Sequence, residues 1–269
     1  DNAYAVILLD CAPTAESLRF VSLPTTLDWY MKNIFGFQRT MLKAARPLLN
    51  RIAPVELPPE KYFQNLESLF EKIGGIDTLL KDPLTTSVRL VTNAEKMVLR
   101  ETQRAFVYFS LHGLTVDEII VNRVLPDQIH DSFFDAWRLS QQHTLAEIDR
   151  YFNPVPVRRI PLFPHEVLGY ERLRLLADHL YQSGNDPVAV TRTEAPYSFV
   201  RCDGYHEIRL LLPFAEKAEV GLFKKDDELV IEVGTLRRHV GLPTSMAALT
   251  PTRARLEDRM LIVEMRSAS

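Results

Sequence analysis

The sequence has 269 residues, of which 46% are apolar and 25% charged, and its formal net charge is −3. A chain of this length can bury a substantial core in one or two domains. The near balance of charges gives no electrostatic case for nucleic-acid binding, which normally shows as a basic face, so we expect no nucleic-acid partner.

Cysteine content and hydropathy indicate the expected compartment. Cys11 and Cys202 are the two cysteines, and they form neither a C-x-x-C motif nor a Cys/His cluster, so a disulfide framework is not expected. No apolar run approaches the roughly 18 residues of a transmembrane helix, and the first residues show no signal-peptide pattern. We therefore expect a cytoplasmic protein without a transmembrane segment.

The first predicted element is a buried strand over residues 4–10, whose apolar run ends on Asp10. A carboxylate there lies at the sheet edge where open α/β sheets bind ligands. In P-loop ATPases, an acid at the end of a buried strand helps hold Mg²⁺. Pro13 stiffens the following turn, and Thr14 offers a hydroxyl and an N–H to an anion or to attacking water. The alternative is that Asp10 is a helix N-cap or turn residue.

Nearly eighty residues separate this strand from the next, more than one crossover helix requires. Apolar residues at helical spacing predict an amphipathic helix with a basic flank over 34–52 and a second helix over 62–73 that ends at Gly74-Gly75. Two interpretations of this helical insertion stay open. Its apolar stripes pack on the parent domain, or they form a groove for an apolar client helix.

Further strands are predicted at 87–92, 116–122 and 157–160, each followed by a helical pattern, which indicates a mostly parallel sheet. Thr92 and Glu95 form a capping-box pattern ahead of a helix over Lys96–Leu111, and Gly113 suits its end. Two more helices are expected at about 131–152 and 166–181. The second has an apolar stripe of Val167, Leu173, Leu176 and Leu180.

Residues 183–195 are rich in Ser, Gly, Asn, Asp, Pro and Thr and are predicted to form a linker. Beyond it, β-type runs with turn signals such as Asp203-Gly204 and Asp226-Asp227 predict an antiparallel β-sandwich over 196–266. The expected strands are 197–201, 206–212, 219–224, 228–233, 236–242, 253–256 and 261–265.

Four ordered segments resemble one family. The decapeptide Asp10–Arg19 resembles the switch segment of the ArsA/GET family of dimeric anion-pump and tail-anchored-protein-targeting ATPases. The segments Leu90–Lys96, Ile120–Pro126 and Ile160–Gly169 resemble later segments of the same family. This resemblance implies a P-loop NTPase-like domain over residues 1–182, with a helical insertion at about 28–85, that uses ATP and Mg²⁺.

The resemblance also implies roles for individual residues. Asp10 would take part in Mg²⁺ coordination, and Pro13 and Thr14 would belong to the catalytic switch. Asn122 with Arg123 would meet the adenine edge, and the base would be walled by Pro161, Leu162 and Phe163. Considered without the resemblance, Asn122 is a strand-end turn former and Pro161 a strand-edge residue.

Several departures from the family pattern limit these implications. Ala15-Glu16 replaces the Gly-His pair of the switch, and no Gly-rich phosphate loop occurs in the 269 residues. We expect that segment to precede Asp1 and expect this chain alone not to hydrolyse ATP. The stretch 127–134 lacks the family's Cys-x-x-Cys pair, so a homodimer without a zinc site is expected. Two distant cysteines do not supply the clustered thiols of an arsenite site.

The C-terminal segment resembles an α-crystallin (small heat-shock protein) domain in the runs 204–214, 227–231 and 254–261, with Arg259 at the position of a usual glycine. We expect it to be a fixed accessory domain. The leading hypothesis is an ATPase that couples its nucleotide state to handling of an apolar client helix or similar cargo. The alternative is a nucleotide-independent chaperone or binding module for apolar segments.

Overall fold

The computed structural model describes residues 4–11, 60–181 and 185–267, and the chain divides into two compact units, Asp1–Lys81 and Asp82–Ser269. The first unit contains helix α3 (Glu60–Lys81). This helix passes through Gly74-Gly75, where the sequence predicted its end. Each glycine costs a helix only about 1 kcal/mol relative to alanine, and the Asp77–Lys81 ion pair supports the last turn. The helix predicted over 34–52 lies outside the described residues.

Residues 4–11 differ from the prediction of a buried strand. They form no strand, and the large apolar side chains from Tyr4 to Leu9 are exposed to solvent. A strand of a parallel sheet is buried because it has hydrogen-bonded neighbours and helices on both faces. Within the part of the chain that the structure describes, no strand pairs with residues 4–10, so their apolar side chains remain uncovered.

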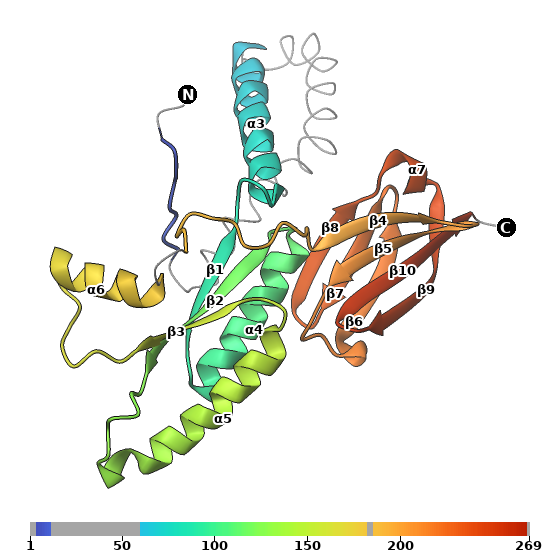
Figure 1. Cartoon of the computed structure of the whole chain (residues 1–269). Helices are drawn as coiled ribbons and strands as arrows, with labels where there is room; N and C mark the ends of the chain where they lie inside the picture. The colour runs from blue at the N-terminus through green and yellow to red at the C-terminus, as the bar shows by residue number, and fades with distance from the viewer. Residues whose placement is uncertain (1–3, 12–59, 182–184, 268–269) are drawn as a thin grey trace, which may run out of the picture. The chain divides into compact units, whose positions relative to one another are not determined.

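The second unit begins with a parallel three-stranded sheet in the order β1-β2-β3 (Figure 1). Its strands are β1 (Val88–Asn93), β2 (Val116–Val124) and β3 (Val157–Pro161), close to the predicted runs. Helices α4 (Lys96–Leu111), α5 (Asp135–Phe152) and α6 (Tyr170–Leu180) follow them in turn, and the 3₁₀ turn η2 (Ser132–Phe134) precedes α5. The fold of this part is therefore α/β with a parallel sheet, as predicted.

The predicted start of α4 is confirmed, but the predicted capping interaction is not. Glu95, not Thr92, is the N-cap residue, and its side chain makes no capping hydrogen bond. The Thr92 hydroxyl is buried at the end of β1 and accepts a hydrogen bond of 2.7 Å from Thr102 Oγ1 instead. The predicted capping box therefore does not form, because Thr92 still belongs to the strand. Gly113 has a φ of 81° just after the helix, as expected for a C-terminal stop.

Helix α6 is shorter than predicted. It begins at Tyr170, because Gly169 has a φ of 79° that interrupts the helical backbone. Of the predicted stripe, Leu180 is buried and Leu176 packs beside it, whereas Leu173 is exposed. The helix therefore covers the sheet mainly with its C-terminal half.

The seven predicted strands of the C-terminal segment are all present. One antiparallel sheet has the order β4-β5-β10-β9 and the other the order β6-β7-β8, and their facing side chains form a shared core. The elements are β4 (Tyr197–Cys202), β5 (Tyr205–Leu211), η3 (Lys217–Glu219), β6 (Val220–Lys225), β7 (Glu228–Val233), β8 (Leu236–Gly241), α7 (Thr244–Ala247), β9 (Leu249–Glu257) and β10 (Met260–Ser267). The arrangement is the predicted antiparallel sandwich.

The sandwich and helix α4 share one hydrophobic core. Val107 and Leu111 of α4 are buried together with Ile208, Leu210 and other sandwich residues. Tyr197 lies at this junction, and its hydroxyl donates a 2.8 Å hydrogen bond to the carbonyl of Leu111. Burial raises the pKa of the Tyr197 hydroxyl well above its ordinary value, so it remains a donor at physiological pH.

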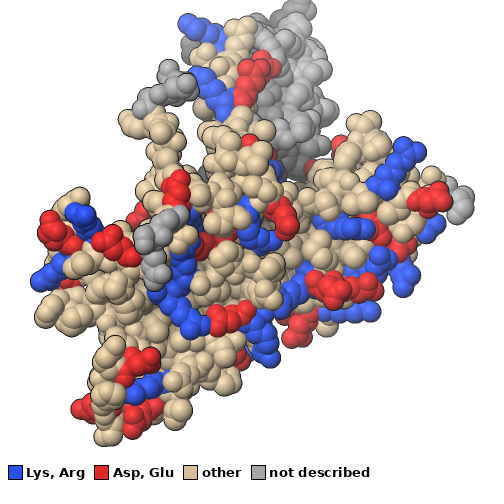
Figure 2. All heavy atoms as spheres, in the orientation of Figure 1, with Lys and Arg blue, Asp and Glu red and all other residues tan. Residues whose placement is uncertain are grey.

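Charged side chains of both signs intermix on the face of the molecule that Figure 2 shows. Among the described residues, no helix has the length and apolar character needed to cross a membrane.

Candidate functional site

The carboxyl ends of the three parallel strands form the edge where the sequence placed a ligand site. Asn93 ends β1 and pairs in register with Asn122 of β2, and Val124 at the end of β2 pairs with Pro161 at the end of β3. Ligands of open α/β sheets bind outside these strand ends. The polar ends of neighbouring strands are therefore held side by side by the sheet itself.

The residues predicted to bind the base come from two adjacent strand ends. The Leu162 N–H donates a 2.7 Å hydrogen bond to the carbonyl of Val124, which ties the chain after β3 to the end of β2. Asn122 and Arg123 precede Val124 on β2, and Pro161 precedes Leu162 on β3. The structure thus brings together Asn122, Arg123, Pro161 and Leu162.

Asn122 has a local contact as well. Its side-chain oxygen accepts a 2.9 Å hydrogen bond from the backbone N–H of Arg123, whose φ is 56°. This is the turn-forming role that the residue type predicts on its own. An amide oxygen has two lone pairs and its NH₂ group has two donors, so the side chain retains hydrogen-bonding capacity for a base edge.

The three predicted wall residues differ in exposure. Pro161 is half-buried and Leu162 is exposed, so both offer apolar surface near the strand ends. Phe163 packs against the cluster of Ile120, Ile160 and Leu180, and its ring centroid lies 5.5 Å from that of His179 on α6. The position of Phe163 is therefore set by α6.

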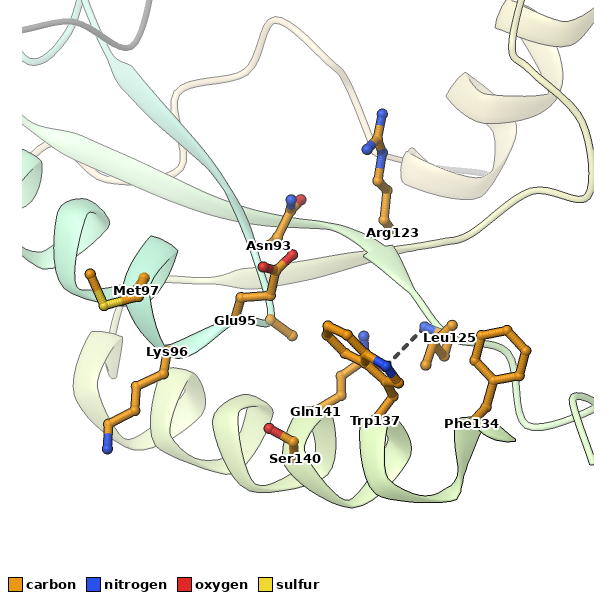
Figure 3. A pocket seen from close by; sticks show the side chains of 11 residues that line it. Asn93, Glu95, Lys96, Met97, Arg123, Leu125, Phe134, Trp137, Ser140 and Gln141 are labelled. Atoms are coloured by element: carbon orange, nitrogen blue, oxygen red, sulfur yellow. Dashed lines mark hydrogen bonds between the residues drawn. The ribbon is translucent and has the colours of Figure 1, made fainter. Parts of the chain in front are cut away.

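A hollow of about 320 Å³ opens between the first turns of α4 and α5. The lining side chains come from the ends of β1 and β2 and from the N-terminal turns of both helices (Figure 3). Gln141 Oε1 accepts a 2.9 Å hydrogen bond from the Leu125 N–H, which fixes the loop after β2 to α5. We call this hollow the helix pocket, and its lining residues are Asn93, Ala94, Glu95, Lys96, Met97, Arg123, Leu125, Phe134, Trp137, Ser140 and Gln141.

Of the predicted site residues that the structure describes, Arg123 alone lines the helix pocket. Phe134, Trp137 and Gln141 were not predicted. A signal for them exists in the sequence, because the three recur at spacings of three and four residues in the predicted helix. The same stripe continues into the buried residues Leu145, Ile148 and Phe152. Its C-terminal half covers the sheet, and its N-terminal half extends to the pocket, where Trp137 is 56% exposed.

A buried charge cluster on the sheet also escaped the sequence analysis. Asp117 and Glu118 of β2 are fully buried, and Arg89 Nε lies 3.6 Å from a carboxylate oxygen of each. Arg158 of β3 forms a direct ion pair with Glu118 and donates to the Leu180 carbonyl at the end of α6. The sequence did contain a signal for this cluster, because one predicted strand carries two acids and a neighbouring predicted strand carries an arginine.

This charge cluster holds part of the predicted linker against the sheet. Arg89 donates hydrogen bonds to the carbonyls of Pro187 and Ala189, and Thr191 Oγ1 donates one of 2.7 Å to the Asp117 carbonyl. Thr115 donates to the Glu194 carbonyl farther along. Over its described residues, 185–195, the segment is therefore docked rather than free.

The remaining predicted site residues lie elsewhere in the chain. Asp10 belongs to the unit Asp1–Lys81 and is exposed, and Pro13 and Thr14 lie outside the described residues. Within the described ranges, no three His, Cys, Asp or Glu side chains cluster as a metal site. Mg²⁺ is commonly held by one or two carboxylates together with substrate phosphates, so a single aspartate suits that mode.

Comparison with known proteins places these features in a family context. A family model described as anion-transporting ATPase matches residues 1–182, and a model of the HSP20-like domain found in ArsA matches residues 203–265.

Three relatives bear the name of arsenical pump-driving ATPases. One from Aquifex aeolicus is 43% identical over 269 residues, which cover 98% of this chain and 68% of that protein. Those from Chlorobaculum tepidum and Prosthecochloris vibrioformis are each 33% identical over 261 residues, which cover 96% of this chain and 64% of each relative. The chain thus spans about two thirds of the length of these relatives.

Proposed function

Because the chain belongs to the anion-transporting ATPase family, we propose that it supplies the base-binding part of an Mg-ATP site and takes part in ATP hydrolysis. One observation carries the proposal: Asn122, Arg123, Pro161 and Leu162 converge at two adjacent strand ends. There Asn122 would hydrogen-bond the adenine edge, and Pro161 and Leu162 would flank the base. Phe163, held by α6, would complete the wall.

The same proposal gives Asp10 the role of holding Mg²⁺. When bound, the ion neutralises charge on the phosphate oxygens during phosphoryl transfer. Asp10 is exposed, so its carboxylate is accessible to a hydrated ion. Pro13 and Thr14 would act in the switch after it. The sequence contains no Gly-x-x-x-x-Gly-Lys phosphate loop, so this chain supplies no such cradle for the phosphates.

For the cargo, we propose an apolar helix rather than arsenite. The names of the relatives refer to an arsenical pump, but a soft metalloid is bound by clustered thiols. Cys11 and Cys202 belong to different compact units of this chain. Helix α3 has exposed apolar residues on it, namely Tyr62, Leu69, Ile76 and Leu79, which supports a surface for apolar segments. The assembly would be a homodimer without a zinc site, in the cytoplasm.

Calorimetric titration of the full-length protein with Mg-ATP tests the proposed base site. We expect saturable binding that weakens about tenfold in Asn122→Ala, because a hydrogen bond from a buried base edge is worth about 1–2 kcal/mol. Ser132→Ala, an exposed substitution in η2, serves as the control and should bind like the wild type. Equal affinities of Asn122→Ala and the wild type would remove Asn122 from the base site.

A second candidate is a nucleotide-independent chaperone, favoured by the HSP20-like match over residues 203–265. The two functions differ in how cargo binding responds to nucleotide. The ATPase proposal expects the affinity for an apolar helical peptide to change when Mg-ATP is added to the full-length protein. Peptide binding that is identical with and without Mg-ATP would favour the chaperone.

A further inference from the structure

The turn between β9 and β10 has an unusual backbone for its sequence. Asp258 and Arg259 have φ values of 49° and 66°, the left-handed region in which tight hairpin turns favour asparagine, aspartate and glycine. Arginine is disfavoured there, because its Cβ approaches the backbone carbonyl. We therefore expect the Arg259 side chain to make an interaction that offsets the cost of this backbone conformation.

The Arg259 guanidinium makes that interaction with helix α5. It donates hydrogen bonds of 2.8 Å to the Arg150 carbonyl and 3.1 Å to the Tyr151 carbonyl, and a third to the Asn153 carbonyl. The last carbonyls of a helix have no partners within the helix, and a cation there is favoured by the helix dipole. Arg259 thus caps α5 from the sandwich.

A second contact strengthens the same junction. The Arg259 carbonyl accepts a 2.8 Å hydrogen bond from the Leu212 N–H, which ties the turn to the segment that carries Phe214. The Phe214 ring packs edge-on against Phe152 at 5.2 Å and against Phe106 at 5.7 Å between centroids. The C-terminal end of α5 is therefore fixed to the sandwich by hydrogen bonds and by ring packing.

The other end of α5 lines the helix pocket through Trp137, Ser140 and Gln141, next to Phe134 of η2. The sixteen residues from Trp137 to Phe152 span about 22 Å of helix. Leu145, Ile148 and Phe152 are buried between these ends, so α5 sits on the core as one continuous element. Because the α-helix is one hydrogen-bonded element, the placement of its C-terminal end constrains the placement of its N-terminal turns.

We propose that Arg259 is a positioning residue for the helix pocket. By anchoring the C-terminal end of α5 to the sandwich, Arg259 fixes the positions of Trp137 and Gln141 near the opposite end of the helix. The sandwich then influences the geometry of the helix pocket although none of its residues lines the pocket. This proposal does not depend on the proposed ATPase function, because it concerns the placement of α5 and not the ligand.

Tryptophan fluorescence in the full chain tests the proposal directly. The 269 residues contain two tryptophans, so Trp29→Phe, together with replacement of any tryptophan outside these residues, leaves Trp137 as the sole reporter. In that background we compare Arg259→Gly, which suits the left-handed turn but removes the guanidinium, with Arg259→Lys, which keeps a cationic donor. The measured quantities are the emission maximum of Trp137 and its quenching by acrylamide.

We expect Arg259→Gly to shift the Trp137 emission and to change its quenching constant, and we expect Arg259→Lys to give values of both between those of Arg259→Gly and those of the wild type, because lysine keeps the charge but not every hydrogen bond. The control is Arg237→Ala, because Arg237 pairs with Glu232 within the sandwich; it should leave both quantities unchanged. If Arg259→Gly unfolds cooperatively on heating, and the emission maximum and quenching constant of Trp137 equal the wild-type values, Arg259 does not position the pocket.

Hydrogen exchange provides a second readout should the Arg259→Gly variant be too unstable for fluorescence. In Arg259→Lys, one ammonium group replaces the guanidinium that donates three hydrogen bonds to α5. We expect backbone amides to exchange faster than in the wild type at the C-terminal end of α5 and also over residues 134–141. Faster exchange confined to residues 148–155, with 134–141 unchanged, would overturn the proposal, because the anchor would then act only locally.

Discussion

Glu207 illustrates how a single charged residue is accommodated in the four-stranded sheet. Its carboxylate is buried, and it accepts hydrogen bonds of 2.8 Å from Arg209 and 3.0 Å from Arg255. Burial acts to raise the pKa of Glu207, but the hydrogen bonds and charges of the two arginines outweigh it and hold the pKa below its ordinary value. The group therefore stays ionised in the folded state at pH values where the unfolded chain takes up a proton.

The pKa shift predicts how stability depends on pH. A lowered pKa in the folded state contributes stability above the unfolded pKa of about 4.3, and the contribution is lost as the pH falls through the folded value. We expect Glu207→Gln to lower the free energy of unfolding by about 1 kcal/mol at neutral pH, since its partners are only partly buried. The variant should also lose less stability on acidification, as urea titrations would measure.

Glu257→Gln is the matched control, because Glu257 also pairs with Arg255 but is 61% exposed. We expect its free energy of unfolding at neutral pH to lie within about 0.5 kcal/mol of the wild-type value, because exposed ion pairs contribute little. A Glu207→Gln variant whose acid titration runs parallel to that of the wild type would show that Glu207 carries no pH-dependent stability.

Residue identity alone predicted some of these roles and not others. Arg259 stood out as a departure from a usual glycine, but its guanidinium contacts with α5 depend on two segments more than a hundred residues apart. Thr92 had the pattern of a capping residue, yet tertiary structure kept it in the strand, where Thr102 is its partner. Local pattern identifies a residue as special, and long-range packing decides what it does.

At the scale of elements, α5 is divided between core and pocket. Ile148 is fully buried in the α/β core, whereas Leu139 on the same helix is 69% exposed. We expect Ile148→Ala to lower the free energy of unfolding by about 2–5 kcal/mol, because it leaves a cavity, and Leu139→Ala to change it by less than about 0.5 kcal/mol. Chemical denaturation measures both. Equal losses would mean that the burial of this helix face is misassigned.

Most helices and strands could be predicted from the sequence, because the spacing of apolar residues indicates which side chains are buried. The strands β1, β2 and β3 were recognised from short β-type runs of apolar residues, although each also contains charged residues, and turn signals separate some of the sandwich strands. The strand expected at 4–10 failed because an apolar run predicts burial but not the partner that provides it. The helix pocket was missed because it depends on how the ends of α4, α5 and β2 meet.

At the scale of the whole molecule, α4 joins the α/β layer to the sandwich. Val107 and Leu111 are part of the sandwich core, whereas Leu99 and Phe106 of the same helix are part of the α/β core. A shared helix makes the unfolding of the two layers interdependent. The unit Asp82–Ser269 should therefore unfold as one cooperative body.

Val107→Ala tests this cooperativity. The substitution should lower the free energy of unfolding by about 2 kcal/mol through loss of buried methyl groups. Hydrogen exchange should show reduced protection in both the parallel sheet and the sandwich strands. Met97→Ala, at an exposed position on α4, is the control. Reduced protection in only one layer would show that the two layers unfold independently.

The central claim is that the ends of β2 and β3 bind the base of a nucleotide, and hydrogen exchange of the full-length protein with and without Mg-ATP tests it most directly. We predict slower exchange at residues 122–125 and 161–163 when Mg-ATP is present, and no change at these residues when only magnesium is added. Saturating Mg-ATP that leaves the exchange of both segments unaltered would contradict the claim.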